Sequence, residues 1–165
     1  MKNFGTHQEI VTDTPLIKEK FDDGFRITAC AARGSTFYVI MTKDTKEYRA
    51  KGQKWFTRST WSGVTKPEIE KGYREGKILT GICYSTGLRQ YFVVMTEMPE
   101  EQCCYWFDCT KEGVSAKTDW MDEKYKEGFH PAIIFKDPTY NQILFVMTKD
   151  ENRSNYILVN NYKLK

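Results

Sequence analysis

Histidine and cysteine side chains are the first candidates for chemistry in this chain of 165 residues, which holds two histidines and five cysteines. A nucleophilic site needs a base beside the nucleophile, and that base is most often histidine. His7 lies close to the N-terminus, and His130 falls in a predicted strand where two similar segments carry Arg26 and Ile78. A position whose chemistry changes from copy to copy indicates an exposed strand residue. We therefore predict no catalytic residue and no enzymatic activity.

Three of the cysteines lie within seven positions, in the segment CCYWFDC at 103–109. A structural zinc site usually takes two pairs of ligands, and Cys104 and Cys109 would point to opposite faces of a strand. We predict buried or half-buried thiols, no metal and no cofactor, and a redox-sensitive site is the alternative. The odd cysteine count and the polar start MKNFGTHQEI favour an intracellular protein, cytoplasmic or nuclear, without disulfides.

The elements that must hold these side chains repeat along the chain. A glycine after a charged segment marks each copy, at steps of 52 residues: Gly24, Gly76 and Gly128. A methionine ends an apolar run in each copy, at steps of 54 and 52 residues: Met41, Met95 and Met147. Two markers with nearly one spacing indicate a triplicated structural unit. Because the methionine recurs in every copy, a core position is favoured over a ligand groove.

Each copy predicts a short helix followed by three strands. In the helix, apolar residues four positions apart share one face, and the glycine follows its end. Two apolar runs separated by turn-forming residues then predict an antiparallel hairpin, and a third strand follows. The helices are expected at 14–24, 65–76 and 118–128, and the third strands at 53–60, 103–110 and 154–161. Pro131 lacks an N–H, so its strand should carry an edge or a bulge there.

The predicted fold class is α+β with mainly antiparallel β structure, in a pseudo-threefold or small propeller-like, toroidal arrangement. We expect a single domain over 1–165, with repeat units at 14–64, 65–117 and 118–161. The N-terminal strand 7–13 precedes the first helix as the third strands precede the others, so it is predicted as an extra copy of the third strand. That copy either seals a ring or covers one edge of an open array. Each unit alone is too small to bury its apolar face.

Trp61 is the candidate binding residue. It lies in STWSGVT, within an insertion at 58–65 that the other copies lack. An exposed loop tryptophan is a reasonable anchor for a protein interface, and a lid over the core is the alternative. Trp55 and Trp106 fall in predicted third strands and are expected in the core.

The first copy resembles a known repeat. FDDGFRIT at 21–28, followed by FYVIMTK at 37–43, is similar to repeats in the C-terminal region of plant casein kinase I-like nuclear kinases, the photoregulatory kinases, and in some multidomain bacterial proteins. The match spans about 14–161, and it departs from the pattern at Lys77 and Pro131. That family is a repeat domain of unknown function, so the resemblance implies a domain that can lie beside an enzyme and supplies no active site. The chain itself lacks the kinase motifs.

Composition bears on the partner. Charges nearly balance, with 25 basic and 22 acidic residues, whereas nucleic-acid binding normally shows a concentrated basic face. No apolar run approaches the roughly 18–20 residues of a membrane span. We predict a non-enzymatic interaction domain, or a small subunit of a larger assembly, that docks a protein partner through exposed aromatic and loop surface. The alternative is a module that binds a sugar, a nucleotide or a short nucleic acid.

Overall fold

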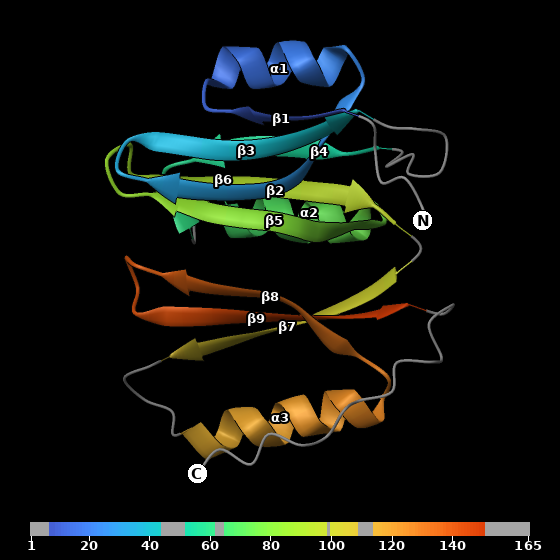
Figure 1. The fold of residues 1–165 in the computed structure, drawn as a ribbon. Coiled ribbons are helices and arrows are strands. Elements are labelled where there is room, and N and C mark those ends of the chain that lie inside the picture. Colours follow the sequence, from blue (N-terminus) through green and yellow to red (C-terminus); the bar gives the residue numbers. More distant parts are fainter. Residues whose placement is uncertain (1–6, 44–51, 62–64, 99, 109–113, 151–165) are drawn as a thin grey trace.

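The computed structural model describes residues 7–43, 52–61, 65–98, 100–108 and 114–150. Within them, the order strand, helix, strand, strand occurs three times (Figure 1). The elements are β1 (His7–Val11), α1 (Thr14–Asp22), β2 (Phe25–Arg33), β3 (Thr36–Lys43), β4 (Lys54–Arg58), α2 (Lys66–Arg74), β5 (Lys77–Ser85), β6 (Gln90–Glu97), β7 (Glu100–Asp108), α3 (Val114–Lys126), β8 (His130–Asp137) and β9 (Gln142–Asp150). The prediction of mainly antiparallel β structure with three repeated helices is confirmed.

The described strands form three sheets of three strands, in the orders β1-β3-β2, β4-β6-β5 and β7-β9-β8. The predicted hairpins are confirmed as antiparallel pairs. The strand before each helix pairs with the second strand of the hairpin that follows that helix. Hydrogen bonding therefore groups β1 to β3 as a first unit, β4 to β6 as a second and β7 to β9 as a third. The segment 154–161 lies outside the described residues.

The helices are held by apolar residues on one face. Ile17 of α1 and Ile69 of α2 are buried at positions that the sequence places on the apolar side. The residues before these helices, Asp13 and Thr65, make no capping hydrogen bond through their side chains, so packing against the sheets is the main support of two short helices. The third helix starts at Val114, before the predicted 118.

The repeated glycines occupy one environment. Each has a positive φ, of +89°, +74° and +92° in chain order, which an L side chain rarely adopts. In each, the N–H donates to the carbonyl of the aromatic residue three positions earlier, at 3.0–3.1 Å. The residues are Gly24, Gly76 and Gly128. The helix therefore ends in the same way in all three units, which accounts for the regular glycine spacing.

The first strand of every hairpin carries a bulge at one position, after Ile27, Leu79 and Pro131. The bulge predicted at Pro131 is confirmed, and β8 is also an edge strand. The repeated methionines lie opposite these residues and are buried, as predicted for core positions: Met41, Met95 and Met147.

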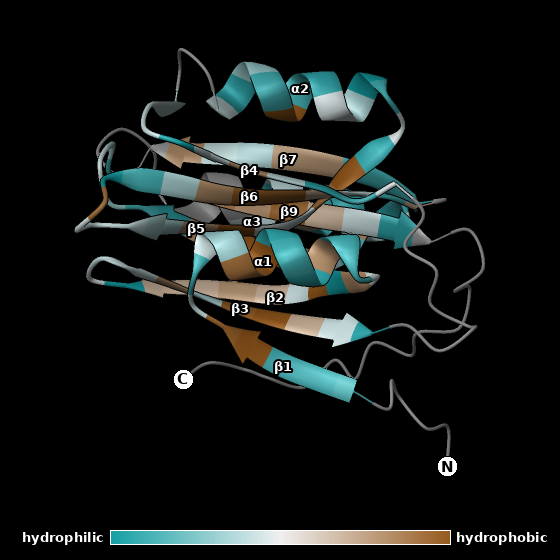
Figure 2. Cartoon of the chain, turned by 90° about the horizontal axis from the view of Figure 1, so that it is seen from above, coloured by the Kyte–Doolittle hydropathy of each residue, from teal (hydrophilic) through white to brown (hydrophobic). Residues whose placement is uncertain are grey.

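The sheets pack face to face in chain order. We call the face of a sheet that looks toward the next unit its forward face, and the opposite face its backward face. One apolar cluster combines the forward face of the first unit with the backward face of the second, where Phe92 and Val94 lie. A second cluster combines the forward face of the second unit with the backward face of the third, where Leu144 and Val146 lie. In the view from above, β1, β2 and β3 lie along one edge of the body (Figure 2).

The stack is open at both ends in the part of the chain that the structure describes. No residue of the first unit belongs to the cluster between the second and third units, so the sheets are not closed into a ring. Helix α3 lies on the far side of the third sheet from the second unit (Figure 1). None of the described helices has the length and apolar character needed to cross a membrane.

Two glutamines bridge consecutive units. The side-chain amide of Gln53 forms hydrogen bonds with both the N–H and the carbonyl of Ile27. The amide of Gln102 does the same with Leu79. We call each arrangement a glutamine clasp. Both clasps hold the bulged residue of one unit with a side chain from the next unit, at equivalent places.

Candidate functional site

Trp61 is buried, with 7% of its surface exposed. Its ring lies 4.5 Å from that of Trp106 and 5.3 Å from that of Tyr91, between ring centroids. Of the two alternatives for this residue, the structure shows the lid over the core, at the junction of the second and third units. Trp61 can reach a ligand through the cavity that it lines.

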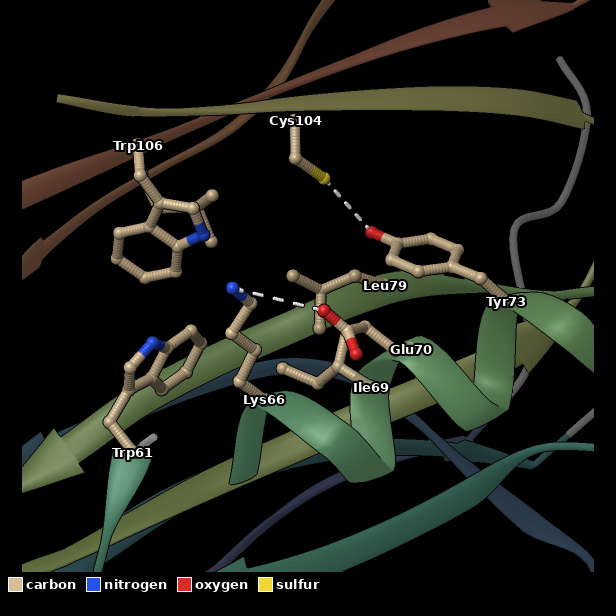
Figure 3. Close-up of a pocket in the computed structure, with 9 residues that line it drawn as sticks. Trp61, Lys66, Ile69, Glu70, Tyr73, Leu79, Cys104 and Trp106 are labelled. Atoms are coloured by element: carbon tan, nitrogen blue, oxygen red, sulfur yellow. Dashed lines mark hydrogen bonds and ion pairs between the residues drawn. The ribbon is translucent and has the colours of Figure 1, made fainter. Parts of the chain in front are cut away.

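That cavity, of about 180 Å³, lies between α2 and the third sheet (Figure 3). Its lining is mainly apolar and includes Ile69, Leu79 and the two indole rings of Trp61 and Trp106. Figure 3 shows Tyr73 and Cys104 meeting across it from α2 and β7, and an ion pair joins exposed Lys66 and Glu70, with Nζ and Oε1 3.8 Å apart.

The polar groups in the cavity bind each other. The hydroxyl of Tyr73 donates to Oε1 of Gln102 at 2.8 Å and lies 3.1 Å from Sγ of Cys104. Burial raises the pKa of the Tyr73 phenol, and partial loss of hydration raises the pKa of the Cys104 thiol, although part of that residue is exposed. Both groups therefore stay protonated at neutral pH, and the cavity presents apolar surface without a reactive thiolate.

The two histidines lie in different units. His7, on β1, is exposed and forms a hydrogen bond between Nε2 and Oε1 of Glu9 at 2.8 Å. His130 is half-buried at the start of β8, where it pairs in register with Thr148. The structure thus does not bring His7 and His130 into one site.

The described cysteines are free thiols: Cys83 is buried and Cys30 and Cys103 are half-buried, as predicted, whereas Cys104 is exposed, so the prediction is wrong there. The thiols of Cys30 and Cys83 form a hydrogen bond across the junction of the first and second units. This hydrogen bond, together with burial, raises the pKa of Cys83. Cys103 and Cys104 are consecutive in β7, and Cys109 lies outside the described residues. Among the side chains that the structure describes, no three potential metal ligands gather.

The backward face of the first sheet is the second candidate site. Three large apolar side chains are exposed there: Ile10 by 71%, Tyr38 by 41% and Ile40 by 37%. Their counterparts in the second unit are Trp55, Phe92 and Val94, by the matching register of β1–β3 and β4–β6. Phe92 and Val94 are only 0% and 1% exposed because the first unit covers them. We call this surface, Gln8, Ile10, Tyr38, Ile40 and Thr42, the outer face.

The outer face was not singled out from the sequence, although a signal for it exists. The repeat aligns Tyr38 and Ile40 with Phe92 and Val94, so all four read as core positions. Whether such a residue is covered depends on which unit lies next to it, and no described unit lies against the first sheet on this side.

Among the residues that the structure describes, the outer face and the Trp61 cavity are two candidate binding surfaces. The residues of the outer face occupy repeated positions of the triplicated fold, whereas Trp61 comes from the insertion that is particular to the first copy. No protein family model, no curated protein and no solved structure matches this chain, and the resemblance to plant kinase repeats stays a prediction.

Proposed function

We propose that this chain is a non-enzymatic interaction domain, or a small subunit of a larger assembly, that docks a protein partner on its outer face. The observation that carries the proposal is the exposure of Ile10, Tyr38 and Ile40 at positions whose counterparts are covered in the second unit. A cluster of exposed apolar residues on a folded surface is typical of an interaction site.

The energy available on this surface supports docking together with further contacts. Fully burying one large apolar side chain contributes about 1.5–3 kcal/mol, and these three are already partly covered, so about 1 kcal/mol each is a reasonable share. Their sum of about 3 kcal/mol falls short of the roughly 8 kcal/mol of a micromolar complex. Polar contacts around the apolar residues must therefore contribute to any stable complex.

We also propose that the three units are consecutive blades of a propeller-like, toroidal arrangement which this chain leaves open. The two unit junctions use equivalent faces and equivalent glutamine clasps, so a further sheet on the outer face would continue the same stacking. The resemblance to repeats that lie beside kinases supports a docking role. A location in the cytoplasm or nucleus stays a prediction.

Replacement of outer-face residues tests the proposal. Partners captured with the wild-type chain are identified, purified and titrated against Ile10→Asp and Ile40→Asp variants. A charge in the middle of an apolar contact should weaken binding at least about tenfold. The matched control is Leu88→Asp, because Leu88 is an exposed apolar residue in the turn between β5 and β6. If Leu88→Asp weakens the purified complex as much as Ile40→Asp does, the outer face is not the docking surface.

The Trp61 cavity favours a second function, the binding of a small ligand. A cavity of about 180 Å³ is below the usual 300–1,000 Å³ of drug-sized pockets, and apolar cavities of about 150 Å³ accept benzene. A single apolar ring therefore fits better than a nucleotide. Indole and phenol serve as probes: a saturable rise in Tm that the Cys104→Met variant abolishes by filling the space supports this function. An equal rise in both proteins excludes it.

A further inference from the structure

In each glutamine clasp, a side-chain amide forms hydrogen bonds with the backbone of an edge strand, where no further strand pairs. In the first clasp, Oε1 of Gln53 accepts the N–H of Ile27 at 2.7 Å, and Nε2 donates to the carbonyl of Ile27 at 3.0 Å. The same Nε2 donates to Oγ1 of Thr96 at 3.0 Å. An amide offers a donor and an acceptor side by side, which matches the N–H and the carbonyl of one residue on an edge strand. The clasp thus satisfies a backbone group at the junction of two units.

The second clasp repeats this geometry. The N–H of Leu79 donates to Oε1 of Gln102, and Nε2 of Gln102 donates to the carbonyl of Leu79, both at 2.9 Å. Nε2 also donates to Oγ1 of Thr148 at 3.2 Å. Because the same atoms form the contact at both junctions, we expect a further unit to attach through the same clasp.

Gln8 occupies the position of the clasp glutamines in the first unit, and among the described residues it contacts Thr42 and no backbone of another unit. It lies opposite Thr42 on the outer face, and its Nε2 is 3.4 Å from Oγ1 of Thr42, as in the two complete clasps. Gln8 is exposed, and no described backbone group lies against its amide in the way that Ile27 lies against Gln53. The first unit therefore presents the glutamine of a clasp without a backbone partner from another described unit, beside the apolar residues of the outer face.

At the other end of the described stack, the bulge position of the third unit lacks the backbone N–H that a clasp glutamine accepts. Pro131 occupies the bulge position of the third unit, where the first two units have Ile27 and Leu79. Proline has no N–H, so an amide placed there would keep one hydrogen bond and leave its Oε1 without a donor. An unpaired buried acceptor opposes association. A second copy of this chain is thus a poor occupant for Gln8.

We propose that the partner on the outer face is a strand–helix–hairpin unit of this same architecture, whose bulged edge strand offers the N–H and carbonyl of one residue to Gln8. Pro131 keeps the chain from joining its own copies head to tail. The inference rests on the docking function proposed above. It names the chemistry of the partner: an apolar sheet face with an unpaired backbone N–H and carbonyl on one residue at the bulge.

The chain itself supplies the probe. Sedimentation of the wild-type protein at up to roughly 100 µM, where micromolar contacts are formed, should show a monomer. Pro131→Leu restores the residue of the second unit, and Pro131→Ala restores the N–H without added bulk. Both variants should self-associate head to tail. Adding Gln8→Ala should weaken that association about tenfold or more, because two hydrogen bonds are lost.

A mixture tests the direction of the contact. An Ile40→Asp, Pro131→Leu double variant has a third unit that can accept a clasp but a disrupted outer face. The wild-type chain has an intact outer face and a third unit that Pro131 blocks. Together they should form a one-to-one complex and nothing larger, since each chain has one usable end. Leu88→Asp in place of Ile40→Asp is the control and should allow longer assemblies.

Three results would overturn the inference: both Pro131 variants remaining monomeric while folded by circular dichroism, self-association unaffected by Gln8→Ala, or head-to-tail assemblies of the wild-type chain. None of these affects the docking function itself, which depends on the titration of a purified partner against Ile40→Asp. A partner lost with Ile40→Asp, together with monomeric Pro131 variants, would retain the outer face as a docking surface and reject a unit of this architecture as its occupant.

Discussion

Replacement of Gln102 by alanine is the sharpest test of how the units are joined. Gln102 makes four hydrogen bonds, with the N–H and carbonyl of Leu79, with Thr148 and with Tyr73. Leu79 is buried, so in the variant its N–H and its carbonyl lose their partner at a place where water has little access. All four hydrogen bonds are lost; the two to the backbone of Leu79, at about 1 kcal/mol each, together with part of the cost of buried groups left unpaired, give about 3 kcal/mol of lost stability.

The same change at Gln8 and Gln53 supplies a graded control. Gln8→Ala removes one long, exposed contact and should change the free energy of unfolding by less than about 0.5 kcal/mol. Gln53→Ala should fall between the two, because Gln53 makes three hydrogen bonds and has no tyrosine partner. For a chain of this length, about 3 kcal/mol corresponds to a fall in Tm of about 6–12 °C.

Two probes separate a local effect from a global one. In a Trp55→Phe, Trp120→Phe background, tryptophan fluorescence reports on Trp61 and Trp106, which lie at the junction that Gln102 joins, whereas far-ultraviolet circular dichroism reports on all units. Urea unfolding of Gln102→Ala should show the fluorescence change at lower urea than the dichroism change, since neighbouring repeats are stabilised mainly by their junctions. Equal midpoints for the Gln102→Ala and Gln8→Ala variants would refute the assignment of the clasp as a joint.

Three further predictions concern single positions. Gly76→Ala should destabilise the fold by roughly 1 kcal/mol because its φ of +74° strains an L side chain, and urea unfolding measures the loss. Trp61→Ala should cost about 3–5 kcal/mol and free the ring of Trp106, which a red shift of the fluorescence would show in a background where Trp55 and Trp120 are phenylalanine. The hydrogen bond from Lys20 lowers the pKa of Glu9, so the contribution of this pair to stability is present above the unfolded-state pKa and lost as the pH falls through the folded one; NMR titration should show the pKa of Glu9 returning toward its ordinary value in Lys20→Met.

Some of the fold could be predicted because the demand on a residue is local. A glycine that must take a positive φ after each helix, such as Gly76, leaves the same mark in every copy, as does a core methionine in the same strand. Hairpins followed from apolar runs and turn formers. The bulge at Pro131 followed from its missing N–H.

The joints could not be predicted in this way because they depend on the neighbouring unit. The clasp glutamines are spaced by 53 − 8 = 45 and 102 − 53 = 49 residues, unlike the 52 of the glycines, so no period reveals Gln8, Gln53 and Gln102. The burial of Trp61 likewise depends on how α2 meets β7. Exposure of Tyr38 is set by the absence of a covering unit in the described residues, which no property of the strand itself encodes.

The outer face combines two features that together argue for an occupant. A repeat could keep apolar residues at Tyr38 and Ile40 simply because its other copies need them, so apolar exposure alone leaves open whether anything binds there. Gln8 adds an amide at the position of the clasp glutamines, with its Nε2 near the equivalent threonine, Thr42, as in the two complete clasps. At the opposite end, Pro131 removes the very N–H that such a group needs. Among the described units, the first thus presents the amide that a clasp needs while the third lacks the N–H, so the proposed partner unit is expected on the outer face and not on the third unit.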